Sequence, residues 1–336
     1  MFTRTWLLWA GLMAIGCKRP PPAVSFYYWK TSYGPSAADS AVLAENQVKE
    51  LYLRYFDLDL PPQEKQPALL AAIRFVQPPD SSLHIIPVIY IKNRVFTGTA
   101  DSLVPRLAVQ AAAAVRQISE TAGVHHREIQ VDCDWTLQTR DRYFRFLRAF
   151  REAAGCPLSA TIRLHQVKYP VRSGIPPVDR GVLMYYNMGR IADIPENSIY
   201  DEKTAARYAA SIPAYPLPMD LALPIFSWGI QLRNGKVVNL LNKMNMAGFS
   251  DPAMFVQDGD HRFNVIRAGF RAGYYFQEND VVKIELVSSA SLRAIAAGIR
   301  SNPQHPFAKL LFYDLDSANY NRYEKTIFKD IAAALR

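Results

Sequence analysis

Alternation of apolar and polar positions is clearest in residues 128–136, which read E-I-Q-V-D-C-D-W-T. Successive side chains of a β-strand point to opposite faces, so this stretch predicts a short strand with one apolar and one acidic face. The apolar face comprises Ile129, Val131, Cys133 and Trp135, and the polar face comprises Gln130, Asp132 and Asp134. A parallel sheet is covered on both faces, so carboxylates there must be paired, protonated or used in chemistry. The alternative is an ordinary strand whose polar side faces solvent.

Similar apolar runs recur along the chain, separated by segments of helical periodicity. The predicted strands cover residues 25–31, 50–60, 83–91, 128–136, 158–167, 181–188, 220–229 and 308–316. The predicted helices cover residues 37–48, 67–75, 102–122, 140–154, 204–211, 291–300 and 323–335. This alternation predicts an α/β protein, and eight strands fit a (β/α)8 TIM barrel. An open doubly wound sheet is the alternative, but no glycine-rich phosphate turn follows the first strand.

The alternation of strands and helices stops between the seventh and eighth strands. Within residues 230–287 the sequence predicts a turn at Glu278-Asn279-Asp280, between two short strand patterns at 274–277 and 281–287. We therefore expect an inserted loop or a small β-containing subdomain, in which these two strands pair with each other.

The N-terminus has the pattern of an exported lipoprotein. An apolar run too short to span a bilayer ends in A-I-G-C, and K-R-P-P-P follows. This run resembles a bacterial lipobox, which implies a signal peptide at 1–16, lipidation of Cys17, a tether at 17–24 and a barrel at 25–336. The protein would then be anchored to the cell membrane or outer membrane. The alternative is an ordinary secretory signal or a membrane anchor with an incidental Cys.

Composition adds few constraints. The 336 residues are 49% hydrophobic, enough for a large core without metals or disulfides. The net charge of +9 is not gathered in runs, which favours a solvated basic surface over nucleic-acid binding. Cys133 and Cys156 are expected to be buried thiols or, alternatively, a disulfide. No His or acid cluster has metal-ligand spacing, so we expect no metal, no cofactor and a monomer.

Polar and aromatic residues gather at the predicted carboxyl ends of the strands, where barrel enzymes carry their sites. The candidate catalytic residues are Asp57, Asp132 and Asp134. The candidate substrate-binding residues are Trp29, Lys30, Asp59, Arg163, His165, Tyr186, Asn187, Trp228 and Asp314. Aromatic rings stack on the CH faces of sugars, and a pair of carboxyls can cleave a glycosidic bond. The sequence therefore predicts a glycan as partner.

Each candidate also has a structural interpretation. Asp57 and Asp59 could cap a following helix, and Asp314 and Asp316 could cap the last turn near Ser317. Arg163 could form a salt bridge with Asp132, with Arg54 as a rival partner. His165, Trp29 and Trp228 could be core residues.

Four short motifs resemble the chitinase-type barrels of glycoside hydrolase family eighteen. They are D-C-D-W on the fourth predicted strand, M-Y-Y-N on the sixth, L-P-I-F on the seventh and L-F-Y-D on the eighth. The resemblance implies that Asp132 and Asp134 are the aspartates of the strand-four motif. It also implies that Tyr186 and Asn187 steady an acetamido group and that Trp228 stacks on sugar.

The sequence departs from that family at the acid. The family has a Glu directly after the Trp, where this chain has Thr136, and its first Asp is replaced by Ile129. Either Asp134 or an acid from another strand, such as Asp57, protonates the leaving group, or the barrel binds glycan without cutting it. Three hypotheses follow: a glycoside-hydrolase-like lipoprotein acting by a carboxylate pair, a non-catalytic glycan-binding barrel, or an assembly lipoprotein that contacts protein through its insertion.

Overall fold

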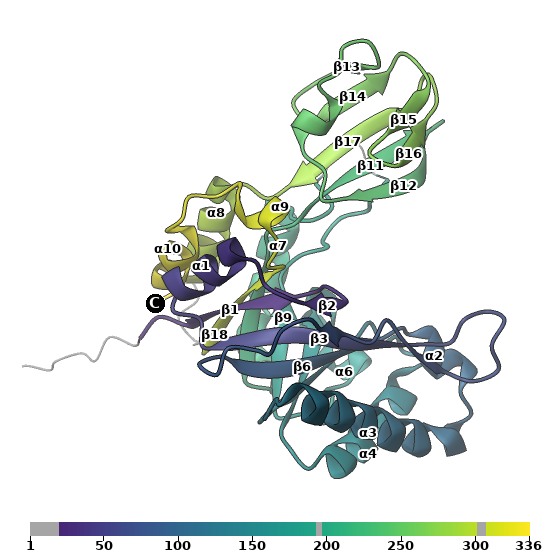
Figure 1. Ribbon diagram of the computed structural model, residues 1–336, viewed down its shortest axis with the longest axis vertical. Coiled ribbons are helices and arrows are strands. Elements are labelled where there is room, and N and C mark those ends of the chain that lie inside the picture. Colours follow the sequence, from purple (N-terminus) through teal and green to yellow (C-terminus); the bar gives the residue numbers. More distant parts are fainter. Residues whose placement is uncertain (1–19, 193–196, 301–306) are drawn as a thin grey trace, which may run out of the picture.

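Eight parallel strands close into a barrel in the computed structural model, which describes residues 20–192, 197–300 and 307–336. The order around the barrel is β1-β3-β6-β7-β8-β9-β10-β18, and β18 pairs with β1 to close it (Figure 1). The strands are β1 (Ala23–Tyr28), β3 (Glu50–Asp59), β6 (His84–Ile91), β7 (Ile129–Cys133), β8 (Leu158–Arg163), β9 (Arg180–Met184), β10 (Met219–Pro224) and β18 (Lys309–Tyr313). The predicted (β/α)8 TIM barrel is therefore confirmed.

Helices cover the outside of the barrel, and their sequences explain the contact. In α4 (Arg140–Ala154) the buried residues Tyr143, Phe146, Leu147 and Phe150 recur at helical spacing and face the barrel wall. Gly155 ends this helix at a φ of 67°, a conformation that glycine adopts without strain. The other helices of eight or more residues are α1 (Ala37–Glu45), α3 (Val104–Ala122), α7 (Glu202–Ala209), α8 (Ser289–Arg300) and α10 (Ile327–Ala334). The shorter ones are α2 (Arg94–Gly98), α5 (Leu164–Lys168), α6 (Pro170–Ser173) and α9 (Ser317–Tyr320).

The helix predicted at residues 67–75 is wrong. That segment forms β4 (Ala68–Leu70) and β5 (Arg74–Phe75). The neighbouring strand β1 pairs with β3 only as far as Leu53, so the edge of β3 at 57–59 is free and β4 pairs there in antiparallel. β5 pairs with β2 (Ser32–Tyr33). Since no helix follows β3, the capping role considered for Asp57 and Asp59 is also wrong.

The strand predicted at residues 220–229 is two strands. β10 ends at Pro224, and β11 (Ser227–Arg233) already belongs to an antiparallel sheet inserted between β10 and α8 (Figure 1). This sheet has the order β12-β11-β17-β14-β13 and a hydrophobic core of its own around Phe249, Phe263 and Phe276. Its other strands are β12 (Lys236–Asn242), β13 (Phe255–Gln257), β14 (Arg262–Val265) and β17 (Val281–Leu286). We call residues 227–286 the insertion.

The predicted pairing of 274–277 with 281–287 is also wrong, although both strands exist. β16 (Tyr274–Phe276) pairs with β15 (Gly269–Arg271), whereas β17 pairs with β11 and β14. The turn at Asn279, with a φ of 68°, therefore joins two different sheets. Long-range pairing outweighed the local hairpin signal.

Several predictions concern the N-terminus or the cysteines. The expected signal peptide and Cys17 lie outside the described residues. Among the described residues no helix is long and apolar enough to cross a membrane. Cys133 is buried, Cys156 is partly buried and both thiols are free, so the disulfide alternative is wrong.

Lys309 closes the amino-terminal end of the barrel. Its Nζ lies 2.6 Å from Glu50 Oε2 and 3.6 Å from Glu128 Oε2, and it donates to the Tyr52 hydroxyl at 3.1 Å. These residues come from β18, from β3 and from the residue before β7, so one ammonium group ties together distant parts of the barrel.

We expect Lys309→Met to lower the free energy of unfolding by about 2–3 kcal/mol, since it leaves two partly buried carboxylates unpaired. Urea denaturation measures the change. The control is Lys325→Met, because Lys325 is exposed and lies 3.7 Å from Glu45, where a loss below about 0.5 kcal/mol is expected. Equal losses in the two variants would contradict the role given to Lys309.

Candidate functional site

The alternation predicted for β7 is present. Gln130 accepts a hydrogen bond of 2.8 Å from Tyr27 of β1 across the barrel interior. Trp135 faces outward, where it stacks on Tyr143 of α4 and donates to the Ser173 carbonyl at 3.0 Å. The acidic face of β7 is therefore directed into the barrel, and its apolar face contacts the helices.

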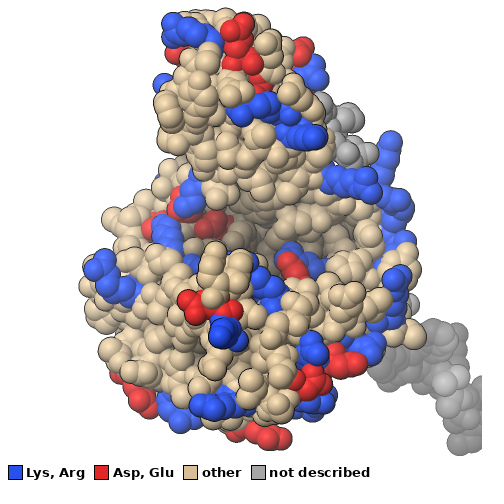
Figure 2. Space-filling model, turned by 90° about the vertical axis from the view of Figure 1, so that its right-hand side faces the viewer, with Lys and Arg blue, Asp and Glu red and all other residues tan. Residues whose placement is uncertain are grey.

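A cavity of about 430 Å³ lies at the carboxyl ends of the strands, between the barrel and the insertion. Figure 2 shows the surface hollowed below the insertion. We call this cavity the mouth pocket. It is lined by Trp29, Tyr90, Asp132, Arg163, Met184, Tyr186, Asn187, Phe226, Ser227, Trp228, Asn242, Lys243, Tyr313, Asp314 and Asn319. Seven of these were sequence candidates: Trp29, Asp132, Arg163, Tyr186, Asn187, Trp228 and Asp314.

Aromatic rings form a nearly continuous wall of the mouth pocket. Trp29 lies 5.4 Å from Tyr313 and 6.3 Å from Tyr90, measured between ring centroids. Phe226 lies 5.8 Å from Tyr313 and 5.3 Å from Trp228. Trp29 and Trp228 are partly buried and line the pocket, so neither is a simple core residue.

Asp132 is the buried carboxyl on the β7 side of the pocket. Its Oδ1 accepts a hydrogen bond of 2.7 Å from the Thr161 hydroxyl of β8. Burial raises the pKa of Asp132 to about 6, although the positive charge of Arg163 opposes the shift. Asp132 can therefore exchange a proton near neutral pH.

Arg163 pairs with Asp134 and not with Asp132, so the salt bridge considered between Arg163 and Asp132 is wrong. Its Nη2 donates to Asp134 Oδ2 at 2.9 Å, and its Nε donates to Oδ1. Asp134 is 52% exposed and does not line the mouth pocket. The proposed role of Asp134 as the acid remains a prediction, and this bidentate pair has to open before the carboxyl can transfer a proton.

Asp314 is the buried carboxyl on the β18 side. Asn319 donates to its Oδ1 at 2.5 Å, and burial raises the pKa of Asp314 to about 6. The residue that caps the last turn is Asp316, which accepts from the Ala318 amide and begins α9. The capping interpretation is thus right for Asp316 and wrong for Asp314.

The end of β3 supplies acids that are already paired. A bulge between Arg54 and Phe56 interrupts the alternation, and Arg54 Nη2 lies 2.6 Å from Asp57 Oδ2. Asp59 accepts from Arg94 at 2.5 Å and from Lys92 at 2.7 Å, and Arg94 chiefly holds its pKa well below the usual range. Neither Asp57 nor Asp59 lines the mouth pocket, and their predicted roles there remain untested.

Neither Lys30 nor His165 lines the mouth pocket. Lys30 Nζ lies 3.5 Å from Asp316 and 3.8 Å from Asp39. His165 was expected on a strand beside Arg163, but β8 ends at Arg163 and α5 begins at Leu164. The Arg163 amide donates to the Gln166 side chain at 2.8 Å, which starts the helix and leaves His165 exposed.

Sequence reasoning missed the pocket residues that come from the insertion and from the turn after β18. Asn242 and Lys243 line the pocket from the end of β12, and Lys243 donates to Asp316 at 2.6 Å. Asn319 lies on α9 and holds Asp314. The Asn234-Gly235 pair is a sequence signal that could have placed Asn242 and Lys243, because it predicts the hairpin in which β12 pairs with β11.

Thr136 occupies the position at which the resemblance would require a Glu. It is exposed, and its amide donates to the Thr139 hydroxyl at 2.9 Å in the turn before α4. A Thr hydroxyl cannot serve as the general acid.

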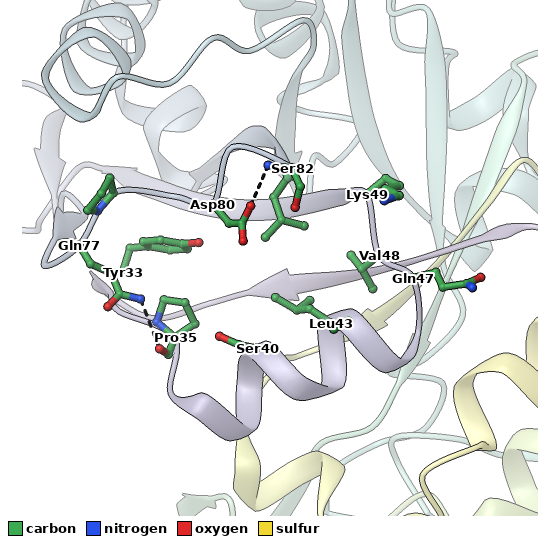
Figure 3. Close-up of a pocket in the computed structure, with 13 residues that line it drawn as sticks. Tyr33, Pro35, Ser40, Leu43, Gln47, Val48, Lys49, Gln77, Asp80 and Ser82 are labelled. Carbon is green, nitrogen blue, oxygen red and sulfur yellow. Dashed lines mark hydrogen bonds between the residues drawn. The ribbon is translucent and has the colours of Figure 1, made fainter.

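A second cavity, of about 850 Å³, lies on the outer wall of the barrel beside α1 (Figure 3). It is lined partly by Tyr33, Leu43, Lys49 and Asp80, and it occupies the side where the crossover after β3 lacks a helix. It shares no lining residue with the mouth pocket, and barrel enzymes carry their sites at the carboxyl ends of the strands, so we place the candidate site at the mouth pocket. Among residues 20–192, 197–300 and 307–336, no group of three His, Cys, Asp or Glu side chains could hold a metal ion.

Comparison with known proteins relates the chain to others through its fold. No family model and no curated protein matches the sequence. A chitinase of Bacillus thuringiensis superimposes with a TM-score of 0.54 at 8% identity, over 94% of this chain and 70% of the other. A spore cortex-lytic enzyme of Bacillus megaterium gives 0.52 at 11% identity, over 95% and 75%. A chitinase-like agglutinin of Robinia pseudoacacia gives 0.51 at 13% identity, over 93% and 99%. The protein thus has the barrel fold of chitinase-like proteins.

We expect Asp132→Asn to gain stability over the wild type as the pH rises. The folded-state pKa of Asp132, about 6, lies above the unfolded value of about 3.9, so ionisation opposes folding. The stability associated with the neutral carboxyl is fully present below pH 3.9 and is lost as the pH rises through 6. Asn cannot ionise, so the difference between variant and wild type should grow between about pH 3 and 7 by up to about 3 kcal/mol and then level off. Urea unfolding at each pH measures it, and a difference independent of pH would refute the raised pKa.

Proposed function

We propose that the mouth pocket binds a sugar unit of a glycan and cleaves its glycosidic bond with the carboxyls of Asp132 and Asp314. The observation that carries the proposal is the combination of two buried, titratable carboxyls with a wall of aromatic rings in one open cavity. Aromatic faces suit sugar rings, and carboxyls suit both sugar hydroxyls and glycosidic oxygens.

The position of the two carboxyls in the barrel supports a division of roles. Three strands separate β7 from β18 in either direction around the barrel, so Asp132 and Asp314 approach the pocket from opposite sides. With both pKa values near 6, one carboxyl can be protonated while the other is ionised. The acid donates its proton to the glycosidic oxygen, and the carboxylate either takes a proton from the attacking water or attacks the anomeric carbon itself.

Other residues of the pocket would orient the sugar. Tyr186 and Asn187 follow β9, and Asn187 adopts a φ of 58°, which Asn tolerates better than most residues. Burial raises the pKa of Tyr186, so its hydroxyl stays protonated and can donate a hydrogen bond to a ligand. Trp29 and Trp228 would supply stacking surfaces.

The fold neighbours suggest which glycans to test first. Two of them are a chitinase and a spore cortex-lytic enzyme, which points to polymers containing N-acetylated sugars. We extend this substrate class to the protein as part of the proposal. The expected lipid anchor at Cys17 would hold the exported barrel on the cell envelope, where such polymers occur.

A non-catalytic glycan-binding barrel is the second candidate, and Thr136 favours it. If neither Asp132 nor Asp314 transfers a proton, the aromatic wall still binds sugar. The assembly hypothesis has one favourable observation, since the insertion exposes Leu240, Phe270 and Tyr275. The open mouth pocket disfavours it, because a scaffold needs no such cavity.

We expect Asp132→Asn and Asp314→Asn each to lower kcat on soluble chitin oligosaccharides or peptidoglycan fragments by at least about 100-fold. Binding should change by less than about threefold, since Asn keeps the shape of Asp. Trp228→Ala should instead weaken binding by about tenfold. Asp101→Asn, on an exposed ion pair with Arg142, serves as the matched control and should leave both quantities unchanged.

The outcomes separate the candidates. Turnover lost in both Asp variants supports the carboxyl pair. Binding without turnover in every protein supports the non-catalytic barrel. Turnover that survives Asp132→Asn and Asp314→Asn but is lost in Asp134→Asn would move the acid to Asp134.

We further expect kcat/KM to have a bell-shaped pH dependence with its maximum near pH 6. Below this pH both carboxyls are protonated and no base remains, and above it both are ionised and no acid remains. Initial rates between pH 4 and 9 test this expectation. A rate that rises steadily to pH 9 would exclude the pair.

A further inference from the structure

Trp228 is the aromatic residue that the insertion contributes to the mouth pocket. It lies at the start of β11, is partly buried and contacts Phe226 edge-on, with ring centroids 5.3 Å apart. The Phe226 contact leaves the tilt of the indole open, because an edge-on contact permits a range of angles. Another contact has to fix the plane of this ring if it is to serve as a sugar platform.

Glu285 on β17 makes that contact. Trp228 Nε1 donates to Glu285 Oε2 at 2.7 Å, between directly paired residues of adjacent antiparallel strands. The carboxylate is 1% exposed, and Lys283 Nζ lies 2.5 Å from its Oε1. A buried, charge-assisted hydrogen bond is shorter and stronger than one to solvent, so it holds the indole in one orientation.

The Glu285 carboxylate also contacts the segment after β9, which is hydrogen-bonded to the backbone of a pocket residue. Ser198, in the segment after β9, donates to Glu285 Oε2. The Ser198 carbonyl accepts from the Met188 amide at 2.9 Å, and the Ile199 carbonyl accepts from the Asn187 amide at 2.8 Å. Asn187 lines the mouth pocket, so Glu285 is linked to the backbone that carries Asn187 as well as to Trp228.

We infer that Glu285 is a positioning residue, which fixes the plane of Trp228 and couples the insertion to the segment that carries Asn187. It does not itself line the mouth pocket. The consequence for sugar binding rests on the proposed function, whereas the orientation of the indole does not.

The orientation can be tested without any ligand. In full-length protein labelled with ¹⁵N at the indole nitrogens, the Trp228 resonance is assigned by its loss in Trp228→Phe. Glu285→Leu removes the acceptor, so we expect the indole proton to shift upfield and to exchange with water faster. Glu285→Gln keeps an acceptor oxygen, so its indole proton shift and exchange rate should lie between those of the wild type and those of Glu285→Leu. An unchanged resonance in Glu285→Leu overturns the inference. If Glu285→Leu does not fold, the measurement is made on Glu285→Gln, and an unchanged Trp228 resonance in that variant overturns the inference.

The effect on binding is tested with a double-mutant cycle, using the N-acetylglucosamine tetramer as probe. Glu285→Leu should weaken binding by about tenfold in the wild type but have little effect in Trp228→Phe, whose ring lacks the N–H. Glu285→Gln should retain most of the affinity. An equal loss in both backgrounds would overturn the inference, since Glu285 would then act through something other than Trp228.

The two proposals fail in different ways. If the wild type binds no glycan but the Trp228 resonance depends on Glu285, the proposed function fails and the positioning role stands. If the wild type binds glycan and neither the resonance nor the affinity depends on Glu285, the proposed function stands and the inference fails.

Discussion

Burial of a carboxyl inside a closed parallel barrel is the constraint on which the rest of the site depends. Closure leaves β7 without a solvent-facing side, so the polar half of its alternating sequence has to be accommodated in the interior. Gln130 is satisfied by Tyr27, and Asp132 is satisfied in part by Thr161. The remaining cost of burial appears as the raised pKa of Asp132. A group that is expensive to ionise in the folded state is also one that can give up or take a proton near neutral pH, so the structural cost and the proposed chemistry have the same origin.

The other acids near the strand ends, in contrast, are paired with cationic side chains. Asp57, Asp59 and Asp134 each have an arginine within hydrogen-bond distance, and Asp59 also has Lys92. Each of these carboxylates is thus engaged by a cationic side chain, and Arg94 chiefly holds the pKa of Asp59 below its usual range. The acids near the strand ends thus fall into two groups. One group is paired with cationic side chains, and the other, Asp132 and Asp314, lines the mouth pocket. In the function we propose, these two carboxyls would do the work of the Glu that the resemblance leads one to expect at Thr136.

The insertion supplies part of the lining of the mouth pocket. It brings Trp228, Asn242 and Lys243 over the strand ends, and Lys243 returns to the barrel through Asp316. Arg322 strengthens this joint, because it donates to the Ile225 carbonyl at 2.5 Å and also to the Ser227 hydroxyl. The pocket is lined by residues of the barrel and of the insertion, which belong to different sheets. Its geometry therefore depends on hydrogen bonds between these two parts, such as the buried one that Ser198 donates to Glu285.

The sequence by itself determined the elements that depend on local periodicity. Period-two alternation predicted β7 and its acidic face, and the succession of strands and helices predicted the barrel, because both follow from which faces have to be buried. Seven of the residues around the mouth pocket followed from their position at strand ends. Only the tertiary structure decided which acid pairs with which base. Arg163 on β8 has two aspartates on the neighbouring strand segment, Asp132 and Asp134, and the choice between them depends on side-chain direction. The tertiary structure also decided the bulge in β3, the extra strand β4 at a free edge and the pairing of β17 with β11. These features arise from contacts between residues far apart in the chain, and no local pattern encodes them.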